Sequence, residues 1–270
     1  MSTISYPEKI SKAINLIKDN SSQKIIAGCT AIDKIPDAAI SIRNIAELKV
    51  IEKREMALGF GSVVTLSSIL NLGKRNIPDV LFDSIKSIAN RNIRNIATIG
   101  GNISGRNFRH TLFSPLLALD AKLTYAKPIF TNITYKTQTV PLAKITEMPD
   151  EAFLTGIIVP LTEWNYSAFQ RFGPSHEINY DSGTFTILAY SESNRLSNIR
   201  LAFASSFLFR NADIETKLMG SYLPLEKSLI DETISAISAK FDEECKKKSL
   251  SPILRKQFFN QLSFHLSQLK

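Results

Sequence analysis

Two glycine-bearing segments, about seventy residues apart, carry residue types that could cradle a phosphate group. Gly28 follows the predicted strand Lys24–Ala27, and Thr98–Asn102 has the sequence Thr-Ile-Gly-Gly-Asn. Glycine lets a backbone approach a ligand closely, so successive N–H groups can point at phosphate oxygens while Thr98 and Asn102 add side-chain hydrogen bonds. Gly-Gly-Asn is also an ordinary turn, because glycine and asparagine tolerate positive φ. The segments therefore predict either a diphosphate site or two turns.

The stretch from Gly73 to His110 is strongly basic. It holds seven Lys or Arg residues against Asp79 and Asp83, in a chain whose formal net charge is +8. This charge suits an anionic ligand or partner, and a solvated basic face explains it equally well. The Thr98 segment lies within this stretch, which favours the anion-binding interpretation of its glycines.

The other reactive side chains are scattered. Cys29 and Cys245 have no second Cys or His at ligand spacing, so the sequence predicts no disulfide framework, zinc site or iron–sulfur site on this chain. Cys29 is interpreted as a small residue in place of glycine, with a redox thiol as the alternative. His110 lacks an identifiable partner for general-base work, and a loop or phosphate-contacting histidine is the simpler interpretation. We therefore predict no catalytic residue and no metal ligand.

Strand and helix patterns alternate up to Pro160, which marks a domain boundary, and strands followed by helices come after it. The predicted strands are 24–27, 39–42, 48–51, 57–61, 122–125, 132–140, 153–160, 165–172, 182–191 and 198–208. The predicted helices lie within 2–20, at 64–70, 77–89 and 114–121, and in the tail from 224. These patterns predict an α+β fold.

The order of the motifs resembles that of one family. The matching segments are Tyr6-Pro7, Ile25–Thr30, Ile93–Ile103, Pro115–Ala121, and Asp150-Glu151 before Ile157–Pro160. Together they are similar to the FAD-binding subunits of molybdenum hydroxylases of the xanthine dehydrogenase and carbon monoxide dehydrogenase type. The string Ile-Arg-Asn-Ile-Ala-Thr-Ile-Gly-Gly-Asn is the most specific part. The resemblance covers the whole chain, strongly to residue 160 and loosely beyond.

The resemblance implies a two-subdomain FAD-binding fold followed by a smaller domain. Residues 1–52 would form an α/β subdomain and 53–160 an α+β subdomain, and 161–270 would form an α+β domain with an antiparallel sheet and helices. Two loops would hold the FAD pyrophosphate, with the isoalloxazine facing an iron–sulfur partner. The residues implied to bind the cofactor are Ile25, Ile26, Ala27, Gly28, Cys29, Thr30, Ala31, Ile32, Ile88, Thr98, Ile99, Gly100, Gly101, Asn102, Thr111, Leu154 and Arg171.

Arg171 aligns with a basic residue that the family places near the flavin. A positive side chain there favours the reduced, anionic flavin. The alternative is a solvated strand residue.

By resemblance, the chain passes electrons from the [2Fe–2S] clusters of a partner subunit through FAD to NAD or another acceptor. A large molybdopterin-binding subunit would complete the complex. The sequence shows no signal peptide and no apolar run of membrane-spanning length, so a soluble, cytoplasmic protein is expected.

Three departures from the family pattern leave a second hypothesis open. Cys29 stands where a second glycine is usual, the connection 31–38 is short, and Thr111 aligns with an acidic residue. A flavin-poor structural or docking subunit of the same kind of complex would tolerate these changes. A nucleic-acid-binding protein is a third hypothesis, but the aromatic interleaving and recognition motifs that it needs are missing.

Overall fold

The computed structural model describes residues 3–20, 23–32, 34–104, 111–129, 135–145, 152–174, 177–246, 248 and 250–270. Its chain forms two compact units that interleave in sequence. The N-terminal unit comprises Met1–Ile77, Ala89–Ser104 and Asp120–Leu161, and the C-terminal unit comprises Pro78–Ile88, Gly105–Leu119 and Thr162–Lys270. The division of the chain into 1–52, 53–160 and 161–270 stays a prediction.

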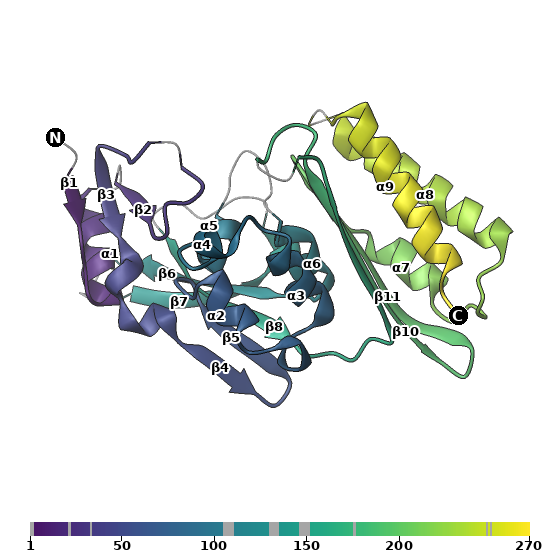
Figure 1. The fold of residues 1–270 in the computed structure, drawn as a ribbon, viewed down its shortest axis with the longest axis horizontal. Helices are drawn as coiled ribbons and strands as arrows, with labels where there is room; N and C mark the ends of the chain where they lie inside the picture. The colour runs from purple at the N-terminus through teal and green to yellow at the C-terminus, as the bar shows by residue number, and fades with distance from the viewer. Residues whose placement is uncertain are drawn as a thin grey trace. The chain divides into compact units, whose positions relative to one another are not determined.

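The N-terminal unit begins with a small parallel sheet (Figure 1). Its strand order is β1 (Thr3–Ser5), β3 (Ala38–Ser41) and β2 (Lys24–Ile26). Helix α1 (Ile10–Asp19) buries Ile14 and Ile17 in one core with Ile40. This packing follows from the helical spacing of the apolar residues of α1, which places them on one face.

A five-stranded antiparallel sheet forms the rest of this unit. Its strand order is β4 (Ile51–Arg54), β5 (Ala57–Gly61), β8 (Phe153–Pro160), β6 (Lys122–Pro128) and β7 (Tyr135–Pro141). The bounds predicted for β5 and β8 are confirmed. The predicted strand 48–51 is wrong in its first half, because Ala46–Lys49 forms a 3-10 turn that buries Leu48. Short helices α2 (Leu66–Leu70), α4 (Arg91–Arg94) and α5 (Ile99–Ile103) complete the unit.

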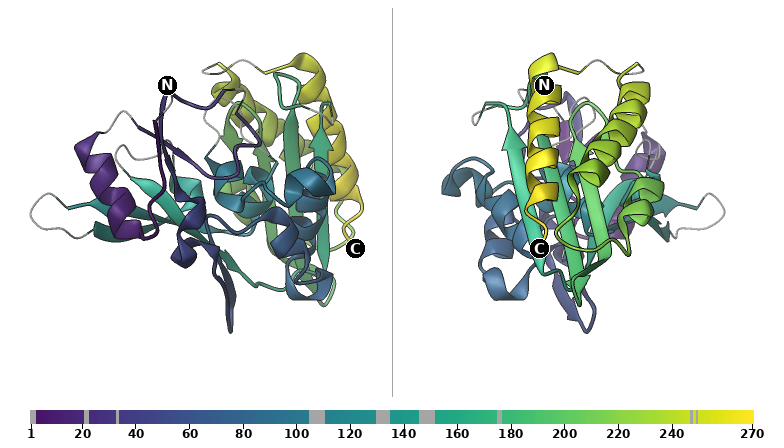
Figure 2. Two further views of the ribbon diagram at one scale, coloured as in Figure 1. Left: turned by 60° about the vertical axis from the view of Figure 1, so that its left-hand side comes forward. Right: turned by 90° about the vertical axis from the view of Figure 1, so that its right-hand side faces the viewer.

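The C-terminal unit is built on a four-stranded antiparallel sheet. Its strand order is β12 (Leu208–Phe209), β11 (Arg195–Ala204), β10 (Gly183–Glu192) and β9 (Tyr166–Phe172). The helices of this unit are α3 (Asp79–Lys86), α6 (Phe113–Ala118), α7 (Ala212–Leu218), α8 (Lys227–Cys245) and α9 (Pro252–Ser267). Helices α8 and α9 lie side by side across the strands (Figures 1 and 2).

Alternate residues of β10 point to opposite faces of this sheet. One face packs an aromatic side chain against α9, and the other makes a polar contact with α6. Phe185 packs with Phe258 of α9, their ring centroids 5.3 Å apart, within an aromatic core. Thr186 shares a buried 2.9 Å hydrogen bond with Ser114 of α6. Sheet, helices and antiparallel pairing confirm the predicted α+β class.

Among the described residues, no helix is long and apolar enough to cross a membrane.

A buried ion pair ties three elements of the C-terminal unit together. Glu215 of α7 is 2% exposed and accepts hydrogen bonds from the Arg210 guanidinium and from the Leu201 N–H of β11. Arg210 also donates to the Leu117 carbonyl of α6 at 3.0 Å. A charge buried at this depth is tolerated only with such partners.

Candidate functional site

The two glycine-bearing segments meet in the N-terminal unit. Gly28 follows β2 at the carboxyl end of the parallel sheet, an edge where α/β proteins commonly bind ligands. A Cβ added to Gly28 would overlap the carbonyl oxygen of Ile96 and lie 3.1 Å from its carbonyl carbon. Only glycine permits this approach. The structure therefore brings the first loop against the backbone that leads into Thr98.

Cys29 has the backbone conformation of a glycine. Its φ is +54°, in the left-handed region that side chains disfavour. Cys29, Thr30, Ala31 and Ile32 are all exposed, so the first loop presents its side chains outward. The small thiol occupies a position whose geometry explains why glycine is usual there.

The second segment is the start of a helix rather than an open loop. Thr98 caps α5: its Oγ1 accepts the Gly101 N–H at 3.0 Å, and its carbonyl accepts the Asn102 N–H at 3.0 Å. A threonine at this position stabilises a helix by accepting such free donors. Thr98 is 4% exposed, so its hydroxyl faces the protein.

The remaining N–H groups of this turn are also bonded within the chain. The Ile99 N–H donates to the Val64 carbonyl at 3.0 Å, and the Gly100 N–H donates to the Ser62 carbonyl at 2.9 Å. These N–H groups thus have acceptors in the cap and in the segment after β5, and a phosphate contact at Thr98–Asn102 stays a prediction.

Gly101 is the exposed glycine of the pair. A Cβ added to Gly100 would lie 2.5 Å from the Ser62 carbonyl oxygen, so Gly100 is needed for packing. A Cβ added to Gly101 would meet, among the described residues, only Thr98 Oγ1 at 3.0 Å. The space that a side chain would fill at Gly101 is therefore open, which fits a ligand that approaches the backbone closely.

The segment that leads from β5 into the start of α2 supports the second loop and was not predicted as part of the site. The Leu66 N–H donates to the Ala97 carbonyl at 2.9 Å, and Thr65 forms an isolated β-bridge with Thr98. The sequence signal was the glycine pattern Gly59-Phe60-Gly61 at the end of a strand, which marks close backbone approach.

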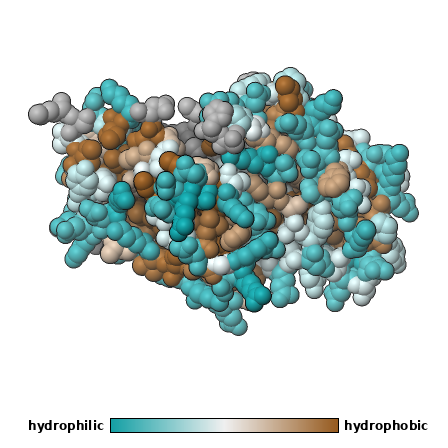
Figure 3. All heavy atoms as spheres, viewed as in Figure 1, coloured by the Kyte–Doolittle hydropathy of each residue, from teal (hydrophilic) through white to brown (hydrophobic). Residues whose placement is uncertain are grey.

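Apolar side chains reach the surface around the first loop. Figure 3 shows them over the part of the N-terminal unit that holds β2 and β3. The exposed apolar residues near the loops in sequence are Ile32 and Ile35, at the first loop, and Ile93 and Ile96, before the second. Clustered exposure of this kind is typical of a ligand or partner surface.

The other predicted contacts are distributed over both units. In the N-terminal unit, Ile25 and Ile26 are half-buried in β2, and Leu154 is 4% exposed within the core of β8. Ile88 and Thr111 belong to the C-terminal unit, where Ile88 is half-buried and Thr111 is buried. Leu154 is thus a core residue, and its contact with a cofactor stays a prediction.

Arg171, on β9 of the C-terminal unit, binds backbone carbonyls. Its guanidinium donates to the carbonyls of Ser87 and Pro174 at 2.9 Å each and of Glu177 at 3.5 Å. Burial lowers the pKa of Arg171 below its ordinary value. The alternative of a solvated strand residue is therefore wrong, and a role near the flavin stays a prediction.

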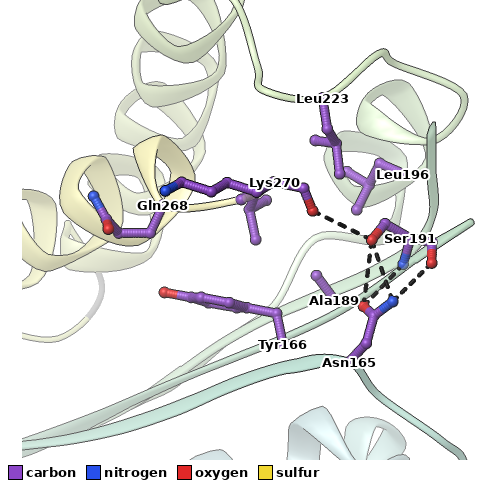
Figure 4. Close-up of a pocket in the computed structure, with 9 residues that line it drawn as sticks. Asn165, Tyr166, Ala189, Ser191, Leu196, Leu223, Gln268 and Lys270 are labelled. Atoms are coloured by element: carbon purple, nitrogen blue, oxygen red, sulfur yellow. Dashed lines mark hydrogen bonds between the residues drawn. The ribbon is translucent and has the colours of Figure 1, made fainter. Parts of the chain in front are cut away.

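Two hollows lie in the C-terminal unit. One, of about 280 Å³, is lined by Tyr166 and by Asn165, which is hydrogen-bonded to Ser191 (Figure 4). None of the predicted cofactor residues lines it. The other, of about 320 Å³, is lined by residues that include Arg171, Gln170 and Gln257. Of the predicted set, only Arg171 lies at either hollow.

Some predicted features lie outside the described residues: Arg106, Arg109 and His110 of the basic stretch, and Asp150-Glu151. Within the described ranges, no three His, Cys, Asp or Glu side chains gather as metal ligands.

Comparison with known proteins finds a family whose model matches this chain. Residues 1–162 match the model of the FAD binding domain in molybdopterin dehydrogenase. The chain is 34% identical over 130 residues to the xanthine dehydrogenase FAD-binding subunit of Escherichia coli O157:H7, covering 44% of each protein. It is 29% identical over 249 residues to indole-3-acetaldehyde oxidase of Zea mays, covering 80% of this chain and 17% of that protein. The matched stretches thus span less than half the length of these relatives.

Solved structures share the fold at low identity. Carbon monoxide dehydrogenase from Hydrogenophaga pseudoflava superposes with a TM-score of 0.78 at 17% identity, covering 99% of this chain and 95% of that chain. Quinoline 2-oxidoreductase from Pseudomonas putida 86 gives 0.75 at 15% identity, covering 100% and 95%. The family match covers more than half of the chain, and it confirms the resemblance seen in the motifs. This chain belongs to the FAD-binding domain family of the molybdopterin dehydrogenases.

Proposed function

We propose that this chain is the FAD-binding electron-transfer subunit of a molybdenum-containing hydroxylase or dehydrogenase complex. Electrons would arrive from the [2Fe–2S] clusters of a partner subunit, beside a molybdopterin-binding large subunit, and leave through FAD to NAD or another acceptor. The observation that carries this proposal is the packing of Gly28 against the Ile96 carbonyl beside the exposed Gly101, inside the residues that match the family.

The chain's own part in this function is to hold and orient the cofactor. Gly101 and the exposed first loop, Cys29 to Ile32, are the groups that would contact FAD, because Thr98 to Gly100 are buried. When bound, FAD supplies the redox chemistry, so no nucleophile or acid–base pair is required of the protein.

One variant tests this placement. Gly101→Val should release FAD from the purified full-length chain, because a β-branched side chain fills the open side of the turn. The far-UV circular dichroism and the melting temperature should stay close to wild type, since within the described residues the added Cβ meets only the Thr98 hydroxyl, at 3.0 Å. Stoichiometric FAD in Gly101→Val would show that the cofactor binds elsewhere.

A second experiment tests electron transfer. The bound flavin would be reduced anaerobically, and NAD or an artificial acceptor would be mixed in. Return of the oxidised flavin spectrum together with NADH formation supports NAD as acceptor. If the oxidised flavin spectrum returns only with the artificial acceptor, NAD is excluded as the acceptor, and the proposed electron transfer is still supported.

A flavin-poor docking subunit is the competing hypothesis. It is favoured by two observations: the N–H groups of Ile99 to Asn102 already have acceptors within the chain, and Cys29 occupies a left-handed position. Absence of bound flavin after purification with added FAD would support it.

A further inference from the structure

We propose that Arg94 is a positioning residue for cofactor binding, one that holds the backbone of Ile96 against Gly28 without touching the cofactor. The inference rests on the proposed FAD-binding function. Arg94 is the arginine of the Ile-Arg-Asn-Ile-Ala-Thr-Ile-Gly-Gly-Asn string. The contacts of Gly101 do not explain why an arginine stands there, and the inference gives it a role.

Arg94 ties down a strained turn. Ala89 has a φ of +43°, a left-handed conformation that favours glycine. The half-buried Arg94 guanidinium donates a hydrogen bond of 2.6 Å to the Ala89 carbonyl. A hydrogen bond from a charged donor is among the stronger ones available to a backbone carbonyl. Arg94 thus stabilises a turn that the alanine side chain disfavours.

This hydrogen bond holds helix α4, which is a single turn, in place. A helix of four residues is not stable by itself, so its position depends on external contacts. Asn90 closes its start, with Oδ1 accepting the Ile93 N–H at 3.0 Å. The Arg94 N–H donates to the Asn90 carbonyl at 3.1 Å, so backbone and side chain of Arg94 hold the same turn.

The far end of α4 carries the atoms that meet Gly28. The N–H groups of Ile96 and Ala97 both donate to the Ile93 carbonyl, at 3.0 and 2.8 Å. The Ile96 carbonyl then packs on Gly28. A shift of α4 would therefore move this carbonyl and separate the two loops.

The test compares FAD dissociation constants of full-length variants by flavin fluorescence titration. Arg94→Met should weaken binding about tenfold, the value of one moderately strong hydrogen bond. Ala89→Gly in the same chain removes the left-handed strain and should restore most of the affinity. Arg91→Met is the matched control, because it removes the same charge from an exposed residue of the same turn and should leave affinity unchanged.

Amide hydrogen exchange without cofactor gives an independent readout. Arg94→Met should speed exchange at Ile96 and Ala97, and Ala89→Gly should reverse this, whether or not the wild-type chain binds FAD. Where Arg94→Met does not fold, Arg94→Lys replaces it, with a smaller loss expected. An equal affinity loss in Arg91→Met, or no rescue by Ala89→Gly, would overturn the positioning role. Failure of the wild-type chain to bind FAD would instead overturn the proposed function.

Discussion

Gly28→Ala tests the meeting of the two loops. The added Cβ would overlap the Ile96 carbonyl oxygen and lie 3.3 Å from the Ala97 Cα. The carbonyl cannot retreat freely, because Ala97 is held on both sides by hydrogen bonds, from its N–H to Ile93 and from the Leu66 N–H to its carbonyl. Overpacking of this kind costs about 2 kcal/mol. If the loops must meet to bind FAD, affinity falls by about 30-fold.

The assay is a flavin titration of the full-length variant, with a melting curve to follow the fold. Gly59→Ala in β5 is the control, because its Cβ would make an ordinary 3.4 Å contact with the Glu52 side chain of β4. Its FAD affinity should match wild type. Wild-type affinity in Gly28→Ala, or an equal loss in Gly59→Ala, would refute the role given to this contact.

Three further predictions concern strain, burial and pH. Cys29→Gly should stabilise the chain by about 1 kcal/mol and keep FAD affinity at least at the wild-type level, because it relieves a left-handed φ; urea unfolding and titration measure both. Glu215→Gln should destabilise the C-terminal unit by about 3 kcal/mol in urea, because it leaves the Arg210 charge buried without its partner. Burial holds the pKa of His265 below its ordinary value of 6.5, so stability should be full above that pH and fall as pH drops through the lowered pKa.

Each of these predictions has an outcome that contradicts it. Lower stability in Cys29→Gly would mean that the thiol makes a contact worth more than the strain. A loss under about 1 kcal/mol in Glu215→Gln would show that the pair acts like a surface ion pair. For the pH effect, the test variant is His265→Gln, which keeps a hydrogen-bond acceptor near the Tyr166 hydroxyl; in the wild type this hydroxyl lies 2.7 Å from His265 Nδ1. If His265→Gln loses stability at low pH as the wild type does, other groups are responsible for the pH dependence.

Local patterns predicted the elements of the fold well. β5 alternates buried and less buried residues along its whole length, and its sequence shows this period of two. β8 is a short apolar run that ends at a proline, which is the pattern of a largely buried strand. The start of α5 was interpreted as a loop because two glycines follow Thr98 and Ile99. The helix forms because Thr98 and the carbonyls of Ser62 and Val64 bond its first N–H groups.

Contacts between distant segments could not be predicted from local patterns. The approach of Gly28 to Ile96 joins backbones that lie far apart in sequence, and only a glycine hinted at it. The three carbonyl partners of Arg171 come from a helix end and a loop, so alignment of a basic residue could not reveal them. Side-chain type limits what a residue can do, and tertiary structure selects among the options.

The most direct test of the central claim is the visible spectrum of the full-length chain, purified in the presence of FAD and then freed of unbound flavin. A flavin spectrum with stoichiometric FAD is expected for the wild-type chain, and it should be lost in Gly101→Val. A colourless wild-type chain that stays folded, alone and in complex with its partner subunits, would contradict it and leave the docking hypothesis.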